Sequence, residues 1–324
     1  MKVAEYVRYG SSEVVRVVER DRPVPGAGEV LVRVGAASIT APDVAARSGR
    51  PLFSRLFFGL TKPKLQVLGS DFAGSIVELG AGVSTFAVGD AVWGATGPRF
   101  GAHAEYVVVA ANGVIARSPA GFSELDAAAL VYGGLTALPF LRDGAGLRAG
   151  QRILVNGASG AVGSIAVQLA KHLGAEVTAV CGSRNADLVR SLGVDEVLDY
   201  ETENFTRSGE QWDVVFDVVG RSSFPSARRV LSPSGVYLSA VPSAGTLLAS
   251  RLAPRRAKIL FTGLRADDLA LADLVELGEL ALAGALVPVI DHAFPLAAAA
   301  EAHHRTEHGP KVGTVLITMS RPDM

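Results

Sequence analysis

Cysteine and net charge are both nearly absent from the sequence. Cys181 is the single cysteine among 324 residues, which excludes an intrachain disulfide and any metal site with several cysteine ligands. Lys and Arg number 31 and Asp and Glu number 32, so the formal net charge of -1 favours neither nucleic acid nor an anionic membrane as the main partner. We therefore expect a protein of a reducing, cytoplasmic compartment that does not bind nucleic acid.

Long hydrophobic runs are also missing. Residues 1–17 alternate like a strand and lack the apolar region of a secretory signal. The most apolar later stretches, residues 127–141 and 269–290, contain Gly, Pro or acidic residues before they reach the roughly 18 residues needed to span a bilayer. We expect no membrane span, and the length suffices for two folded domains.

The most informative stretch is residues 152–200, which predicts a strand, a small-residue turn, a helix and a second strand. Such a unit binds dinucleotides, because a glycine turn lets backbone N–H groups approach a pyrophosphate at the helix N-terminus. The usual G-x-G-x-x-G motif occurs here as A-x-G-x-x-G, so the flanking elements carry the prediction, and a tight turn without a ligand is the alternative. The predicted contacts are Ala158, Ser159, Gly160, Ala161, Val162 and Gly163.

The residues that choose between the two nicotinamide cofactors are expected about 20 positions beyond the turn, where a carboxylate would bind the ribose of NAD. Residues 181–185 contain no carboxylate. Ser183 and Arg184 occupy this place, and an Arg fork suits a phosphate dianion. We predict NADPH, with Tyr200 as a third candidate contact to the 2′-phosphate. The alternative is that Ser183 and Arg184 are solvated residues at the start of a helix.

The chain divides into two patterns. Short strands separated by Gly and Pro turns occupy residues 1–122 and predict a partly open β-barrel. Strands and helices alternate from residue 153, which predicts an α/β, doubly wound parallel sheet with strands at residues 153–155, 176–180, 196–198, 214–218, 236–238 and 258–261. Predicted strands at 287–290 and 313–318 return to the barrel. The predicted domains are therefore 1–122 with 288–324, and 123–287, with the substrate cleft between them.

Five stretches resemble one family: AASITAPD at residues 36–43, LGSDFAGSIVELGAGVSTFAVGDAVWG at 68–94, GLTAL at 134–138, NGASGAVG at 156–163, and PVIDHAFPLAAAAEAH at 288–303. The chain is similar to the medium-chain dehydrogenase/reductase superfamily, and most of all to its zinc-independent, quinone-oxidoreductase-like branch. This resemblance implies a GroES-like barrel beside a Rossmann domain. It also implies a homodimer that pairs through Rossmann edge strands, and NADPH-dependent reduction of quinones or α,β-unsaturated ketones.

The resemblance also assigns residues to the substrate side. Thr40, Ser70 and Tyr132 match the positions of catalytic zinc ligands in other members, and none is a competent ligand at neutral pH, so we expect no metal. Thr40, Asp43 and Tyr132 are the candidate catalytic residues. Tyr132 would donate a hydrogen bond or proton to a developing enolate, with packing at the domain junction as the alternative, and Asp43 would shape the loop. Thr136 would lie near the nicotinamide.

Further cofactor contacts follow from the same resemblance. They are Val219, Val241, Phe261, Thr262 and Lys311. In the family most of these contacts are made by backbone or apolar groups, so the side-chain identities say little.

Two other stretches have open interpretations. Residues 52–60 are rich in large apolar side chains, and a substrate lid, core packing, a dimer contact and a membrane-surface patch are the alternatives. Adjacent helical residues point about 100° apart, so His303 and His304 are predicted to lie on a polar helix surface and not to hold one metal ion together.

Without a metal, the most accessible NADPH chemistry is hydride transfer to an activated acceptor. The sequence therefore predicts an NADPH-dependent oxidoreductase that acts on a small hydrophobic carbonyl compound or quinone. An enoyl reductase of polyketide or fatty-acyl metabolism is one alternative. A low-turnover NADPH-binding redox sensor is another.

Overall fold

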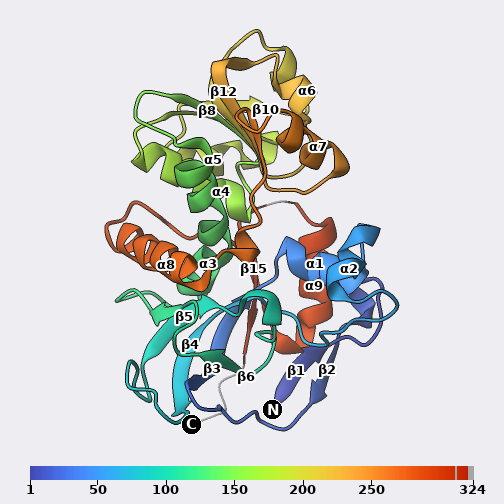
Figure 1. Ribbon diagram of the computed structural model, residues 1–324, viewed down its shortest axis with the longest axis vertical. Helices are drawn as coiled ribbons and strands as arrows, with labels where there is room; N and C mark the ends of the chain where they lie inside the picture. The colour runs from blue at the N-terminus through green and yellow to red at the C-terminus, as the bar shows by residue number, and fades with distance from the viewer. Residues whose placement is uncertain (311, 320–324) are drawn as a thin grey trace.

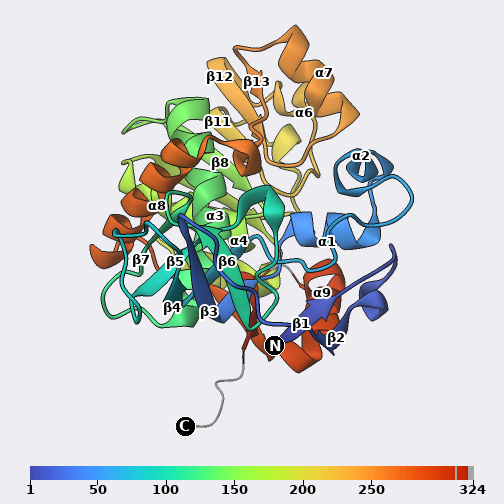
Figure 2. The ribbon, with the colours of Figure 1, turned by 60° about the horizontal axis from the view of Figure 1, so that its bottom comes forward.

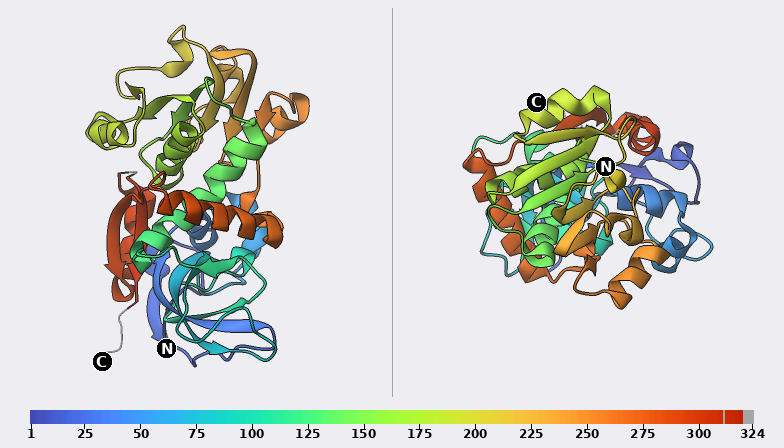
Figure 3. Two further views of the ribbon diagram at one scale, coloured as in Figure 1. Left: turned by 90° about the vertical axis from the view of Figure 1, so that its left-hand side faces the viewer. Right: turned by 90° about the horizontal axis from the view of Figure 1, so that it is seen from above.

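The computed structural model describes residues 1–310 and 312–319. It has two lobes, each built around its own β-sheet, and Figure 1 shows them stacked along the long axis. The left view in Figure 3 shows the Rossmann sheet at one end of the molecule and the first strands of the other lobe at the opposite end, with helices between them. The expected α/β class, with a Rossmann domain beside a GroES-like domain, is confirmed.

The six strands of the Rossmann sheet are all parallel and run in the order β10-β9-β8-β11-β12-β13. This is the doubly wound order, in which a ligand binds at the carboxyl ends of the strands where the winding reverses. Ile153, Leu154 and Val155 at the centre are fully buried, which explains their uninterrupted apolar run. The strands are β8 (Arg152–Asn156), β9 (Glu176–Cys181), β10 (Glu196–Asp199), β11 (Trp212–Asp217), β12 (Leu231–Ser239) and β13 (Ala257–Lys258).

The helices of this lobe include α3 at the junction with the other lobe and α4 after the glycine turn. Their bounds are α3 (Glu124–Pro139), α4 (Ala161–His172), α5 (Ala186–Ser191), α6 (Phe224–Ala227), α7 (Ala244–Leu252) and α8 (Asp267–Leu282).

The GroES-like lobe contains a seven-stranded sheet in the order β14-β15-β3-β4-β5-β7, with β6 also paired to β3. Its strands are β3 (Glu29–Ser38), β4 (Asp71–Leu79), β5 (Ala91–Ala95), β6 (Tyr106–Ala110), β7 (Ile115–Arg117), β14 (Ile290–Pro295) and β15 (Thr314–Thr318), and β1 (Lys2–Glu5) pairs separately with β2 (Arg16–Glu19). Three helices accompany them: α1 (Ala41–Ser48), α2 (Arg55–Phe58) and α9 (Ala299–His308). Because β15 pairs antiparallel with β3, the end of the chain returns to the GroES-like lobe that residues 1–122 begin. The predicted domain boundaries stay predictions.

Two predicted strands are misplaced. Residues 258–261 do not form one, because the chain leaves the sheet after Lys258, whose Nζ donates to the Gly144 carbonyl at 2.6 Å. Residues 287–290 do not either, because Val287 is tied to α4: its N–H and C=O both bond the side-chain amide of Gln168, at 2.7 and 3.1 Å. Strand β14 starts at Ile290 instead.

The expected interruption of the apolar run at residues 127–141 is also wrong. Helix α3 continues through Pro139 into a π-helical stretch, Phe140–Ala145, so that Glu124–Ala145 is long and apolar enough to cross a membrane by length and composition. In this fold, 72% of its apolar window is buried inside the protein. The helix packs against β3, β4 and β5 of one lobe and α4 and α8 of the other, and one apolar core joins Trp93, Leu130 and Val155.

Candidate active site

The glycine turn after β8 positions the N-terminus of α4. Among the described residues no side chain caps this helix, and its first turn contains no acidic residue. The first N–H groups and the positive end of the helix dipole are therefore available to an anion. A Cβ on Gly163 would lie 2.1 Å from the Gly157 carbonyl oxygen, so the close approach of helix and turn requires glycine there.

The predicted turn residues lie together, with side chains that face different ways. Ala158 is fully buried, so its contact to a cofactor would come from the backbone. Ser159 is also buried; its hydroxyl accepts from Asn185 Nδ2 at 3.1 Å, and its carbonyl accepts from Gly313 N–H at 2.7 Å. These bonds tie the turn to the segment after β9 and to the chain that enters β15.

Ser183, Arg184 and Tyr200 form an exposed polar group at the carboxyl ends of β9 and β10. Tyr200 N–H donates to the Cys181 carbonyl, and the Tyr200 hydroxyl lies 3.1 Å from the place a Cβ on Gly182 would occupy. Burial, followed by the charge of Asp199, raises the pKa of the Cys181 thiol to about 11, so the end of β9 itself is neutral. The three predicted residues are thus brought to one place beside the turn.

Asp217, at the end of β11, has a positioning role that the sequence analysis missed. It is fully buried and accepts N–H bonds from Val219 at 3.1 Å, Gly220 at 2.9 Å and Ser222 at 2.7 Å. Asn156 of β8 also donates to it at 3.1 Å. A buried carboxylate directly after an apolar strand was the available signal.

The loop after β11, whose backbone N–H groups bond Asp217, places apolar side chains next to the glycine turn. Val219 and Val241 are partly exposed beside it, and Val219 lies where a side chain on Gly157 would stand. Phe261 is 52% exposed, and Thr262 begins a short helix that contacts α3. Lys311, the last predicted contact, lies outside the described residues.

On the other lobe, Thr40 and Asp43 form the N-terminal cap of α1. The Thr40 N–H and hydroxyl both donate to Asp43 Oδ2, at 2.7 and 2.5 Å, and the Gly69 N–H donates to Oδ1 at 2.8 Å. Both side chains are buried. Because its hydroxyl proton is already donated, Thr40 is a poorer hydrogen-bond donor toward a ligand than its residue type suggests.

Tyr132, on α3, is electrostatically coupled to Asp43 and to Asp71, the first residue of β4. Burial, with added repulsion from these two carboxyl groups, raises the pKa of the Tyr132 phenol, which therefore stays protonated at neutral pH. Thr136 lies one helical turn further along and is buried. The protonated Tyr132 phenol is thus within electrostatic range of Asp43 and Asp71.

Asp71 is a residue that sequence reasoning missed. Its two oxygens accept from the Ser38 N–H at 2.8 Å and the Ser38 hydroxyl at 2.6 Å. Burial raises its pKa to about 7, against the lowering effect of the Ser38 bonds and with a smaller rise from Asp43. The sequence showed Asp71 only as the neighbour of Ser70, because the burial that shifts its pKa comes from β3 and α3.

The three positions that the resemblance matches to catalytic zinc ligands carry no side chain that zinc prefers. They hold Thr40, Ser70 and Tyr132, which present hydroxyl groups, whereas zinc requires thiolate, imidazole or carboxylate ligands. Within residues 1–310 and 312–319, no group of three or more His, Cys, Asp or Glu side chains is placed to hold a metal ion. Both oxygens of Asp43 and of Asp71 already accept hydrogen bonds.

The prediction that His303 and His304 both lie on a polar helix surface is wrong for His303. His304 is exposed, but His303 is fully buried and packs edge-on against His103, with ring centroids 5.6 Å apart. Burial, followed by the charges of His103 and Arg47, holds the pKa of His303 well below its usual range, so the ring is neutral. The approach of the loop at His103 to α9 is a tertiary contact that helix periodicity cannot reveal.

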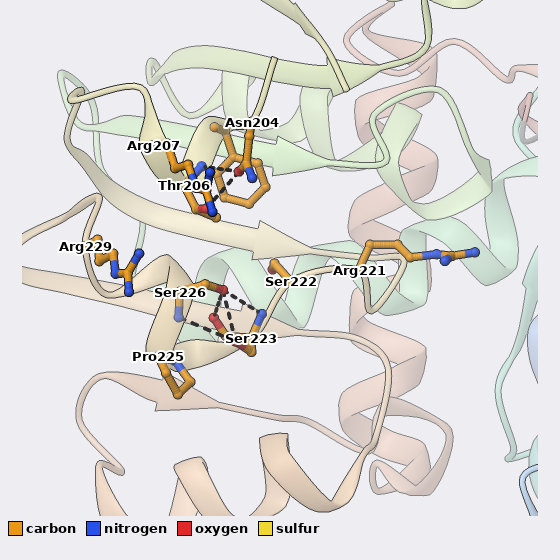
Figure 4. A pocket seen from close by; sticks show the side chains of 10 residues that line it. Asn204, Thr206, Arg207, Arg221, Ser222, Ser223, Pro225, Ser226 and Arg229 are labelled. Atoms are coloured by element: carbon orange, nitrogen blue, oxygen red, sulfur yellow. Dashed lines mark hydrogen bonds between the residues drawn. The ribbon is translucent and has the colours of Figure 1, made fainter. Parts of the chain in front are cut away.

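A cavity of about 450 Å³ opens on the far side of the Asp217 loop and contains none of the predicted site residues. Figure 4 shows that the Arg221 side chain extends away from the other residues and that Ser223 and Ser226 bond one another. Thr206 likewise bonds Asn204. The Ser223, Ser226 and Thr206 hydroxyl groups that line this cavity therefore already have hydrogen-bond partners within the protein.

Two family models match the chain: "Alcohol dehydrogenase GroES-like domain" over residues 26–119 and "Zinc-binding dehydrogenase" over residues 192–317. The NAD(P)H oxidoreductase RTN4IP1, mitochondrial, of Bos taurus is 32% identical over 96% of this chain and 87% of its own. The 2-methylene-furan-3-one reductase of Solanum lycopersicum is 36% identical over 68% of this chain and 58% of its own. The solved quinone oxidoreductase from Coxiella burnetii aligns with a TM-score of 0.88, 28% identity and 99% coverage of both chains.

A Rossmann lobe with a glycine turn before an uncapped helix, joined to a GroES-like lobe, is the architecture of nicotinamide-dependent oxidoreductases. The chain belongs to the medium-chain dehydrogenase/reductase superfamily, in its quinone-oxidoreductase-like branch. It is an oxidoreductase of the quinone or enone kind, and its cofactor is a nicotinamide dinucleotide.

Proposed function

We propose that this protein is an NADPH-dependent, zinc-independent reductase of quinones or α,β-unsaturated carbonyl compounds. The observation that carries the cofactor choice is the exposed group formed by Ser183, Arg184 and Tyr200 beside the glycine turn. It offers two hydroxyls and a guanidinium to a phosphate, and residues 181–185 contain no carboxylate to repel one.

The chain's own residues would hold the cofactor in three ways. The N–H groups at the start of α4 would bind the pyrophosphate, and Arg184 with its neighbours would bind the 2′-phosphate. Val219 and Val241 give an apolar surface beside the turn; Asp217 fixes the Val219 backbone, and Ser239 bonds Val241. When bound, NADPH supplies a hydride; the protein supplies orientation and a low-dielectric surrounding.

On the substrate side, Tyr132 is the proposed donor. As hydride reaches the acceptor, its carbonyl oxygen gains negative charge, and a protonated phenol stabilises that charge by donating a hydrogen bond. Tyr132 keeps its proton because burial and the nearby carboxyl groups raise its pKa. Asp43 holds Thr40 and the Gly69 loop in place and is proposed as a positioning residue.

Zinc independence is supported by the donor set. A zinc-dependent relative would need its ligands where Thr40, Ser70 and Tyr132 stand, and these side chains cannot replace thiolate or imidazole. We expect chelator treatment to leave turnover unchanged, measured with enzyme whose zinc content is quantified before and after.

Two measurements test the proposal. First, binding of NADPH and NADH is titrated for the wild type and for Arg184→Gln. We expect the wild type to prefer NADPH, and the variant to lose roughly tenfold to a hundredfold of NADPH affinity while NADH affinity is unchanged. Arg190→Gln, which removes an exposed Arg paired with Asp187, is the control. Equal or tighter NADH binding by the wild type would refute the cofactor choice.

Second, NADPH oxidation is followed with para-quinones, alkenals, cyclic enones and enoyl thioesters. Turnover with quinones or enones supports the proposal. Turnover confined to enoyl thioesters would favour the enoyl reductase, and cofactor binding without turnover on any acceptor would favour the redox sensor.

A further inference from the structure

Residues 50–64 present large apolar side chains to solvent. Leu56 and Phe57 of α2 are 69% and 66% exposed, and Leu52, Phe53 and Leu60 are exposed as well. We call Leu52, Phe53, Leu56, Phe57 and Leu60 the α2 surface. Figures 1 and 2 show α2 at the periphery of the molecule. Apolar groups gathered at one protruding place mark an interaction site.

The exposure is built into the local packing. Phe58 turns inward and meets Phe100 edge-on at 5.8 Å, and Ser54 is buried. The Tyr9 hydroxyl donates to the Gly59 carbonyl, and the Lys64 N–H donates to the Phe58 carbonyl at 2.8 Å. The segment is therefore anchored by one face, and core packing accounts for Ser54 and Phe58 but not for the α2 surface.

The charge around the α2 surface has one sign. Residues 44–70 contain no Asp or Glu, and Arg50, Arg55, Lys62 and Lys64 flank the apolar side chains. None of these four forms an ion pair with any residue that the structure describes; Arg55 lies over the Tyr9 ring at 4.6 Å. The formal net charge of -1 for the whole chain conceals this local excess.

We propose that the α2 surface docks on an anionic lipid bilayer. Leu and Phe side chains enter the boundary between headgroups and acyl chains, while Lys and Arg beside them attract lipid phosphates, each strengthening binding roughly fivefold. A second copy of this chain is disfavoured, because two such surfaces face to face would bring four like charges from each copy together. Docking itself does not depend on the proposed function; if that function holds, it brings the enzyme to the phase in which apolar quinones dissolve.

The test is sedimentation of the wild type with vesicles of phosphatidylcholine alone and of equal parts phosphatidylcholine and phosphatidylglycerol, without cofactor or substrate. We expect binding to the anionic vesicles that weakens with salt. Leu56→Ser/Phe57→Ser and Lys62→Gln/Lys64→Gln should each weaken it on the order of tenfold or more. Leu269→Ser/Leu282→Ser, at two exposed leucines of α8, should bind as the wild type does.

Any one of four results would overturn the proposal. The wild type could fail to bind the anionic vesicles at low salt, or Leu56→Ser/Phe57→Ser could bind as tightly. The same variant could instead lower the oligomeric mass in light scattering, which would assign the surface to a second copy. It could also raise KM for a short quinone while vesicle binding stays unchanged, which would assign the surface to a substrate lid. Circular dichroism of each variant checks that it is folded.

Discussion

The proposed role of Tyr132 as a hydrogen-bond donor to the substrate is tested by one substitution. In Tyr132→Phe the ring remains and the hydroxyl is lost, so packing on α3 is nearly unchanged. We expect kcat to fall by roughly tenfold to a thousandfold, because one positioned hydrogen-bond donor is removed from the developing oxyanion. NADPH affinity should stay the same, which fluorescence titration checks. Unchanged turnover would remove Tyr132 from the mechanism.

Asp71 gives a prediction for stability against pH. Its pKa is about 7 in the folded protein against 3.8 for the ordinary value, so the folded state binds its proton more tightly. Its contribution to the free energy of unfolding is thus fully present below about pH 3.8 and is lost as the pH rises through about 7. Asp71→Asn keeps an acceptor for the Ser38 N–H and removes the titration.

We therefore expect the free energy of unfolding of the wild type to fall, relative to that of Asp71→Asn, between about pH 4 and pH 7 and to level off above. Denaturant unfolding at a series of pH values measures this difference. A constant difference across the range would show that Asp71 titrates as it does in the unfolded chain. Asp126→Asn, in the exposed cap of α3, serves as the control.

Which site residues could be predicted depends on how local their contacts are. The turn from Gly157 to Gly163 and the pair Ser183 and Arg184 follow from a strand, turn and helix that are contiguous in sequence. Asp71 and His303 could not be recognised, because their burial is created by Ser38 and His103, far away in the chain. A residue type alone does not say whether its partner is water or protein.

At the scale of elements, apolar periodicity located the strands of the Rossmann lobe but not all their limits. The predicted strand at 258–261 is wrong because β13 ends at Lys258, and the one at 287–290 is wrong because Val287 is held by Gln168 and β14 begins only at Ile290. The apolar stretch 127–141 was expected to be too interrupted by Gly and Pro to span a bilayer, yet these residues lie within one long helix whose glycines are packing sites. Interactions between elements therefore override local propensity at their ends.

Gly133 on α3 tests that packing. A Cβ there would lie 2.4 Å from the Ala161 carbonyl oxygen at the start of α4, so Gly133→Ala must push the two helices apart. We expect a loss of about 1–3 kcal/mol in the free energy of unfolding and weaker NADPH binding, since α4 carries the anion site. Gly263→Ala, where a Cβ meets nothing within 4 Å, is the matched control. Equal effects in both variants would contradict the prediction.

For the whole molecule, α3 makes the two lobes one structure, since a single core contains Trp93 of β5, Leu130 of α3 and Val155 of β8. Helix α3, which carries Tyr132, contacts α4 of the Rossmann lobe and both β3 and β4 of the GroES-like lobe, so one helix links the two sheets. Sequence patterns predicted the two lobes and their classes. They did not show that the apolar stretch 127–141 belongs to the long helix that joins the lobes.

The predicted homodimer concerns the whole molecule, and the edge of the Rossmann sheet is the surface where we expect it to form. Strand β13 is the last strand of its sheet and pairs only with β12 among the strands of the described chain, and α7 beside it exposes Leu247, Leu248 and Leu252. A second copy that continued the sheet through β13 would cover these leucines. We expect light scattering to give twice the mass of 33.6 kDa for the wild type.

Leu248→Glu/Leu252→Glu should give the monomer mass, because two carboxylates would have to be buried in the interface. Leu269→Glu/Leu282→Glu on α8 should remain dimeric, and so should Leu56→Ser/Phe57→Ser, because neither pair lies beside β13. A monomeric wild type would contradict the prediction. If the α8 variant dissociates and the α7 variant does not, the second copy binds the α8 side and the Rossmann edge is free.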